Sequence, residues 1–245
     1  MNSREQNILL WFSEHQPEMK VEIITPETAR PGTIYLESRI VATGRYTLTI
    51  NNTKYGYELL IVIPSQSDEW LIPVVYCSDK KLYPALNRHI LSDRKACLGS
   101  WLDILKIMKT GKGFPDFAEK IIDPFIAWQL YYDTFGKPPA WGERMHGFSG
   151  EVEAIVDHLS SIWNLSPERL SRMLFEYKPK KRKKCFCGSK KQFRYCHGKY
   201  FYPIRSKITT IKEMTPDECK RNFVKEEMIL LKTILELPSL PNVLY

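Results

Sequence analysis

Four soft metal ligands gather within thirteen residues of the C-terminal half: Cys185, Cys187, Cys196 and His197. Thiolates and imidazoles are the ligands that zinc prefers, and four of them fill a tetrahedral shell with no position left for water. That arrangement is typical of a structural rather than a catalytic metal. A Gly-Ser pair at 188–189 supplies a turn whose backbone N–H groups can donate to the sulfurs. The sequence therefore predicts one structural Zn²⁺.

This cluster resembles the SEC-C motif, whose usual form is Cys-x-Cys-Gly-Ser, a basic stretch and then Cys-His or Cys-Cys. Every ligand position of the motif is present here. A disulfide is the alternative use of these thiols, but Cys185 and Cys187 are too close in sequence to bridge comfortably. Six cysteines in 245 residues, three of them beside a histidine, favour a metal site in a reducing compartment.

A second candidate for chemistry is Cys97, which precedes Leu-Gly-Ser-Trp at the end of a long irregular segment, with His89 eight residues earlier. Irregular segments of this length in a compact domain are usually functional. A thiol that carries an acyl group must be reachable, and a nearby donor such as His89 can stabilise the oxyanion. Two alternatives remain open, which are a small buried hydrophobic residue and a Cys-His hydrolase with no motif behind it.

The residues around Cys97 resemble those of the ubiquitin-conjugating enzymes. Here Tyr83-Pro84, Asn87-Arg88-His89-Ile90 and, seven residues on, Cys97-Leu98 follow one another. The family has Tyr-Pro, His-Pro-Asn-Ile and, after the same step, the catalytic Cys-Leu. The resemblance implies that Cys97 forms a thioester with the C-terminal carboxylate of a protein. It assigns the oxyanion role to His89 by register only, because this chain has His where the family has Asn.

The segment 124–150 looks like the bacterial branch of that family, which lies beside nucleotidyltransferases in anti-phage operons of the CBASS type. The resemblance implies an enzyme whose partners are an activating enzyme, a carried protein with an accessible C-terminus (a ubiquitin-like protein or a nucleotidyltransferase) and a target protein. We expect His146, within this segment, to be structural rather than a base. A non-catalytic zinc-containing adaptor that binds protein or nucleic acid is the alternative function.

The positive charge of the chain is local. The net charge is +8, but residues 178–199 hold ten Lys and Arg and no acid, so the rest of the chain sums to −2. Aromatic residues are interleaved with these cations, a texture that suits nucleic acid, an acidic protein surface or solvent alone. Because the resemblance implies a protein partner, we expect a protein-docking patch and no useful affinity for generic nucleic acid at physiological ionic strength.

The elements that position these residues follow from periodicity and capping. Ser3 with Gln6 predicts a capping box for an N-terminal helix, and β-rich runs between 33 and 76 predict an antiparallel meander of three or four strands with turns at 51–52 and 65–68. Later helices are predicted over 101–109, 117–135 and 151–163. Two more begin at Ser166 and at Thr215, the last ending near Glu236.

This order predicts an α+β protein, and the resemblance makes the fold that of the ubiquitin-conjugating enzymes plus a small zinc knuckle. We expect a conjugating-enzyme-like domain at 1–165, a helix and basic linker at 166–184, the knuckle at 185–200 and a helical segment at 201–245. No run of about 18 uncharged apolar residues is present, and the N-terminus lacks the pattern of a signal peptide. The chain is therefore expected to be cytoplasmic and not to engage a membrane.

Overall fold

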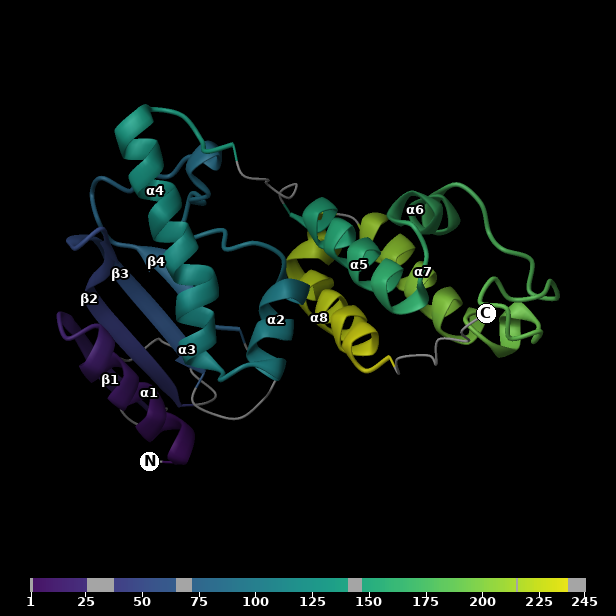
Figure 1. Ribbon diagram of the computed structural model, residues 1–245, viewed down its shortest axis with the longest axis horizontal. Coiled ribbons are helices and arrows are strands. Elements are labelled where there is room, and N and C mark those ends of the chain that lie inside the picture. The colour runs from purple at the N-terminus through teal and green to yellow at the C-terminus, as the bar shows by residue number, and fades with distance from the viewer. Residues whose placement is uncertain (1, 26–37, 65–71, 141–146, 215, 238–245) are drawn as a thin grey trace. The chain divides into compact units, whose positions relative to one another are not determined.

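The computed structural model describes residues 2–25, 38–64, 72–140, 147–214 and 216–237, with the side chains of 216–224 excepted (Figure 1). The chain divides into two compact units, residues 1–99 with 103–143 and residues 100–102 with 144–245. The first predicted domain, 1–165, covers the first unit and extends over one helix of the second. The predicted turn at 65–68 and His146 lie outside the described residues.

The first unit is built on a four-stranded antiparallel sheet in the order β1-β2-β3-β4, so the predicted meander is confirmed. Its strands are β1 (Met19–Ile24), β2 (Arg39–Ile50), β3 (Thr53–Pro64) and β4 (Val74–Cys77). Asn51 and Asn52 join β2 to β3 with positive φ angles of 50° and 62°, as a tight hairpin of matching twist requires. The sequence did not mark β1 as a strand.

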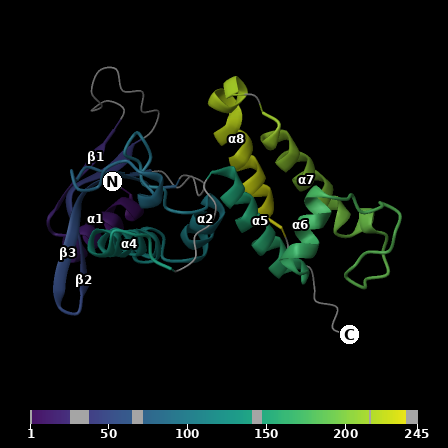
Figure 2. The ribbon, with the colours of Figure 1, turned by 90° about the horizontal axis from the view of Figure 1, so that it is seen from above.

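One face of the sheet is buried because side chains alternate along each strand. In β3 the buried positions are every second residue from Tyr57 to Ile63, and their neighbours in between are more exposed. Helices α1 (Ser3–His15) and α4 (Asp123–Phe135) lie over this face (Figures 1 and 2). Ile8 and Phe12 from α1 and Ile126 from α4 join the strand residues in a single hydrophobic core.

The predicted capping box of α1 is present one residue earlier than expected. Asn2 Oδ1 accepts from Glu5 N at 2.9 Å, and Glu5 Oε2 accepts from Asn2 N at 2.7 Å. The expected pair, Ser3 with Gln6, was therefore wrong. Asparagine caps a helix at least as well as serine, so the first good acceptor in the chain takes the position.

The helix predicted over 117–135 begins earlier and is not regular throughout. It runs through α3 (Phe114–Phe117), one π-helical turn at Ala118–Ile122 and α4, which ends at Gly136 in the left-handed conformation. Two tyrosines tie α4 to the sheet: Tyr46 Oη donates to Asp123 at 2.7 Å and Tyr57 Oη donates to Asp133 at 2.6 Å. These bonds fix α4 over β2 and β3.

The second unit consists of helices and a short loop region. Its helices are α5 (Phe148–Trp163), α6 (Pro167–Phe175), α7 (Gly198–Lys212) and α8 (Pro216–Leu235), of which α7 and α8 pack together (Figure 2). Ser166 caps α6 as predicted, since its Oγ accepts from Arg169 N at 3.3 Å. Helix α2 (Trp101–Thr110) starts among residues 100–102 of this unit, where Glu151 accepts from the N–H groups of Trp101 and Leu102.

The mixture of one antiparallel sheet with helices that follow it confirms the α+β class. Within the described residues, no helix is both long and apolar enough to cross a membrane.

Candidate metal centre and thiol loop

The four predicted ligands of the second unit lie together. One ligand atom from each of Cys185, Cys187, Cys196 and His197 falls within 4.8 Å of all the others. The Nδ1 of His197 is 3.2 Å from the Sγ of Cys185 and 3.4 Å from that of Cys196, and the sulfurs of Cys187 and Cys196 are 3.4 Å apart. Donor atoms around one tetrahedral zinc ion lie about 3.4–3.8 Å apart, so these residues fit a metal ion.

The backbone that brings these ligands together is a small, closed loop. Cys185 N donates to Lys191 O at 2.8 Å, and Phe193 N donates to Lys183 O at 2.7 Å. Gly188 turns the chain with a φ of +73°, which favours glycine. A Cβ at Gly198 would lie 2.6 Å from the carbonyl oxygen of Phe193, so any larger residue would push the His197 end of the loop away.

The ligand sulfurs accept hydrogen bonds from the backbone, as the Gly-Ser turn had suggested. The N–H of Ser189 points to Cys187 Sγ, and those of Cys187 and His197 point to Cys185 Sγ. Burial raises the pKa of the Cys185 thiol to about 11. Burial also acts to raise the pKa of Cys187, but its hydrogen bonds with Ser189, Cys196 and Cys185 together outweigh burial and lower the pKa. Donors of this kind support a thiolate that binds a cation.

Histidine 197 is buried and held by aromatic rings. Its imidazole lies edge-on to Trp163 of α5, with ring centres 5.3 Å apart, and 4.4 Å from the ring of Phe186. Burial lowers the pKa of His197 to about 4, so the ring is neutral at physiological pH and Nδ1 can offer its lone pair. Phe193 packs in turn on Phe201 of α7. The loop is thereby attached to α5 and α7 of its own unit.

The predicted irregular segment, residues 80–101, lies in the first unit up to Gly99, and its backbone there is well paired. Ala96 N donates to Val75 O of β4 at 2.8 Å, and Ala85 and Ile90 form an isolated antiparallel bridge. Arg94 donates to the carbonyl oxygens of Cys77, Asp79 and Leu82 at 2.6–3.1 Å. The segment is therefore a fixed loop attached to the edge strand of the sheet.

Cys97 and His89 meet through the backbone of this loop. Cys97 N donates to His89 O at 2.7 Å, and the Cys97 side chain is half-buried. His89 has a φ of +53°, a left-handed conformation that costs a histidine energy and that asparagine adopts more readily. Its ring lies edge-on to Trp128 of α4, with centres 4.7 Å apart. The backbones of Cys97 and His89 thus lie side by side, while the imidazole packs on α4.

A buried arginine that the sequence did not single out anchors the loop. Arg88 is 3% exposed and donates to Gln129, to Lys81 O and to Asp133. Gln129 donates back to Arg88 O at 2.7 Å, and the guanidinium lies between the rings of Tyr83 and Tyr132, 5.0 and 4.8 Å from their centres. An arginine between two polar residues, here Asn87 and His89, is usually exposed. The sequence therefore did not predict this packing.

Known proteins give no further guide to these two sites. No protein-family model, no curated protein and no solved structure matches the chain. The fold and the sites therefore define the class by themselves. This is an α+β protein with a fixed thiol loop on one unit and a possible metal-binding site on the other.

Proposed function

We propose that this chain is an acyl-transfer enzyme of the ubiquitin-conjugating type in which Cys97 carries a protein C-terminus as a thioester, in bacterial anti-phage defence. The observation that carries the proposal is the placement of Cys97. Its half-buried thiol lies in a fixed loop directly after a four-stranded meander, beside the histidine that the resemblance puts at the oxyanion position.

The chemistry takes two steps. The Cys97 thiolate attacks the thioester carbonyl on an activating enzyme, a new C–S bond forms and the activating enzyme's thiolate leaves. An amine on the target then attacks the same carbonyl, a C–N bond forms, the Cys97 thiolate leaves and the amine loses its proton. In the second step a donor at the oxyanion lowers the barrier, and His89 is the proposed donor.

The other described thiol of the first unit is a poor competitor. Cys77 ends β4 with 1% of its surface exposed, and burial raises its pKa to about 12. A thiol that is buried and protonated reacts slowly, since the thiolate is the nucleophile. This contrast supports Cys97 as the carrier.

We propose Zn²⁺ as the metal of the cluster and a structural role for it. Three thiolates and one imidazole complete a tetrahedral shell, and both the borderline-soft character of zinc and its lack of redox chemistry suit such a site. The cluster lies in the second unit, whereas the thiol loop lies in the first.

The alternative is an adaptor that uses the metal-stabilised loop to bind protein or nucleic acid and has no chemistry at Cys97. It is favoured by the ten cations within 178–199, which the proposed transfer reaction does not use. The two functions differ in what a cysteine substitution does, so one experiment separates them.

The test is co-production of the chain with the products of its neighbouring genes, followed by gel analysis with and without thiol reductant. We expect an adduct of higher mass that the reductant removes, because thioesters exchange with thiols and amides do not. Cys97→Ala should abolish the adduct, Cys97→Ser should give an ester that resists the reductant, and Cys77→Ala should change nothing. Full pathway activity of the Cys97→Ala protein would reject the enzyme and leave the adaptor.

A second comparison isolates His89. His89→Asn restores the family residue and suits the left-handed backbone, whereas His89→Gly keeps that backbone without a donor. We expect loading to be similar in both, and transfer from Cys97 to a target amine to fall on the order of a hundredfold in His89→Gly alone. Equal loss of loading and transfer in both variants would mark His89 as structural.

A further inference from the structure

A cavity of about 450 Å³ lies in the second unit between α6 and the basic linker. Ten residues line it, half of them cationic and half apolar or aromatic: Arg169, Met173, Tyr177, Lys178, Pro179, Lys180, Lys183, Lys184, Phe186 and Phe193. None of them is acidic. Pockets of 300–1,000 Å³ bind small molecules, so this one has the size of a single compact ligand.

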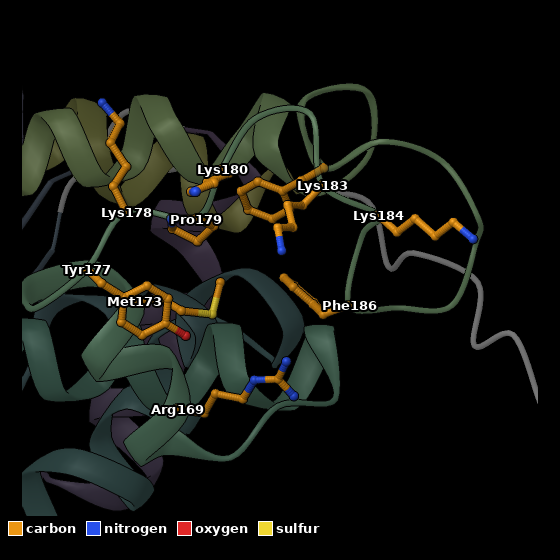
Figure 3. Close-up of a pocket in the computed structure, with 10 residues that line it drawn as sticks. Arg169, Met173, Tyr177, Lys178, Pro179, Lys180, Lys183, Lys184 and Phe186 are labelled. Carbon is orange, nitrogen blue, oxygen red and sulfur yellow. The ribbon is translucent and has the colours of Figure 1, made fainter.

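Three of the five cations border this cavity, one from α6 and two from the basic linker that faces it. Figure 3 shows Arg169, Met173 and Tyr177 on the α6 side, facing the basic linker, while Lys178 and Lys184 direct their ammonium groups away from the centre. Lys178 lies over the ring of Tyr202 instead. Arg169, Lys180 and Lys183 are therefore the cations available to a ligand. Three positive charges around so small a space suit a ligand with concentrated negative charge, such as a phosphate chain.

The rest of the lining suits a flat ring. Met173 and Phe193 are 2% exposed and form an apolar floor, and the half-buried ring of Phe186 borders it. The guanidinium of Arg169 lies 5.9 Å above the Phe186 ring, so one side chain reaches both the charged and the aromatic part. Nucleobases stack on aromatic and guanidinium surfaces. An inorganic anion alone would leave this apolar surface in water.

An extended acidic peptide would fit less well, because the linker has little backbone to pair with it. Its carbonyl oxygens are already used: those of Lys180, Lys181 and Lys183 accept from Lys183 N, Arg194 N and Phe193 N, and that of Pro179 accepts from Tyr202 Oη. Peptides that bind as an added strand need such groups on an open edge. The linker is thus a fixed wall of the cavity rather than a docking strand.

From this geometry we infer a binding site for a free nucleotide, with the phosphates on Arg169, Lys180 and Lys183 and the base against Phe186. The site lies wholly in the second unit and is independent of Cys97. A nucleotide at this site would account for part of the local positive charge, which the proposed transfer reaction does not use. It also explains a cluster of cations around a hollow that a merely solvated linker would not form.

The experiment titrates the purified full chain with ATP, adenosine and inorganic triphosphate, by calorimetry at 150 mM salt. We expect ATP to bind more tightly than either part alone, because each part fills only half of the site. The double variant Arg169→Ala/Lys183→Ala should weaken ATP at least tenfold. The matched control Arg172→Ala/Lys191→Ala removes the same charge from the same helix and loop outside the cavity, and should change ATP affinity less than threefold.

Three results would overturn the inference. Triphosphate binding as tightly as ATP would show that the apolar wall takes no part, and equal losses in the cavity and control variants would show a diffuse charge effect. The third result comes from a fourth ligand, a ten-nucleotide single strand. Binding of this strand more tightly than ATP, with no loss in the cavity variant, would assign the cations to a strand-binding surface and reject the nucleotide site.

Discussion

The two cysteine-bearing regions of this protein are built in opposite ways. In the thiol loop, a single cysteine is half-buried on a segment held by backbone bonds and by the buried Arg88. In the second unit, the ligand atoms of three cysteines and a histidine lie within 4.8 Å of one another, and all four residues belong to one short loop. One region holds a single half-buried cysteine, and the other brings three cysteines and a histidine together.

The difference shows how far geometry alone identifies chemistry. Four ligand atoms within 4.8 Å of one another indicate a site that could hold a metal ion without knowledge of any partner, because all four ligands belong to the chain. The function of a lone thiol depends on the molecules that react with it. Its role therefore has to be tested with those partners. The metal site is therefore the firmer basis for prediction, and the thiol loop gains most from experiment.

The largest effect should follow from loss of the metal. We expect one zinc per chain in the purified protein, and Cys187→Ala should remove it. Because the loop has no core of its own, the second unit should lose several kcal/mol of stability, a fraction of the 10–16 kcal/mol that structural zinc contributes in isolated finger peptides. Elemental analysis and hydrogen exchange at the amides of Cys185 and Phe193, which are bonded across the loop, measure both changes.

Cys97→Ala is the matched control for this experiment, since it removes a cysteine from the other region. Its metal content should stay at one per chain. A protein that contains no metal but shows full hydrogen-exchange protection at residues 185–197 would contradict the proposed structural role. The cysteines of the second unit would then be ordinary packed thiols.

The next effect concerns the anchor of the thiol loop. Arg88→Ala leaves the side-chain oxygen of the fully buried Gln129 without its donor, while Asp133 is exposed and stays bonded to Tyr57, so we expect the cost of one unsatisfied buried polar group, about 1–3 kcal/mol. The loop should also loosen, so Cys97 should be alkylated faster. Denaturant unfolding measures the change in stability, and iodoacetamide labelling measures the reactivity of Cys97. Arg45→Ala, at an exposed position of β2, is the control. Unchanged stability would mean that the backbone bonds and Arg94 hold the loop without Arg88.

Much of this architecture could be predicted from the sequence, where the signal was local. The strand alternation of β3, the Ser166 cap and the four ligands of the metal site each depend on residues close together in the chain. Strand β1 was missed although MKVEII alternates apolar and polar residues as a half-buried strand does, because the predicted strand region began only at residue 33. The capping box was misplaced because two acceptors, Asn2 and Ser3, stand side by side.

What could not be predicted depends on contacts distant in sequence. Arg88 is buried only because α4 supplies Gln129 and Asp133 more than 40 residues later. The cavity beside α6 exists only because the linker folds back over Met173 and the knuckle supplies Phe186. From the sequence alone, the cations of 178–199 are a run of charge, and nothing in it indicates which of them face the cavity.

A smaller effect separates the stability of the second unit from its metal. Glu227 is buried near Glu151, and burial followed by the Glu151 charge raises its pKa to about 7. Because the folded state then holds its proton more tightly than the unfolded state, stability should fall as pH rises from about 4.5 to 7. The loss is on the order of 2–3 kcal/mol. Glu227→Gln should flatten this dependence and raise stability at pH 8.

The measurement is thermal or denaturant unfolding from pH 5 to pH 8 with the metal content monitored. Glu213→Gln, at an exposed position of the same unit, serves as the control and should leave the slope unchanged. If Glu227→Gln kept the full pH dependence, the dependence would belong to the metal loop instead.

The smallest effect is the one that bears most on function. Cys97→Ala should change the free energy of unfolding of the first unit by less than about 0.5 kcal/mol, because the side chain is half-buried and the loop is held by its backbone and by Arg88. Cys77→Ser, by contrast, places a hydroxyl in the core under β4 and should cost about 1–3 kcal/mol. Paired denaturant titrations compare the two variants directly. A cost above about 2 kcal/mol for Cys97→Ala would show that Cys97 is a core residue like Cys77. Its thiol would then serve packing, and the proposal that it carries an acyl group would lose its support. A neutral substitution that nevertheless abolishes the reductant-sensitive adduct would separate stability from chemistry at this position.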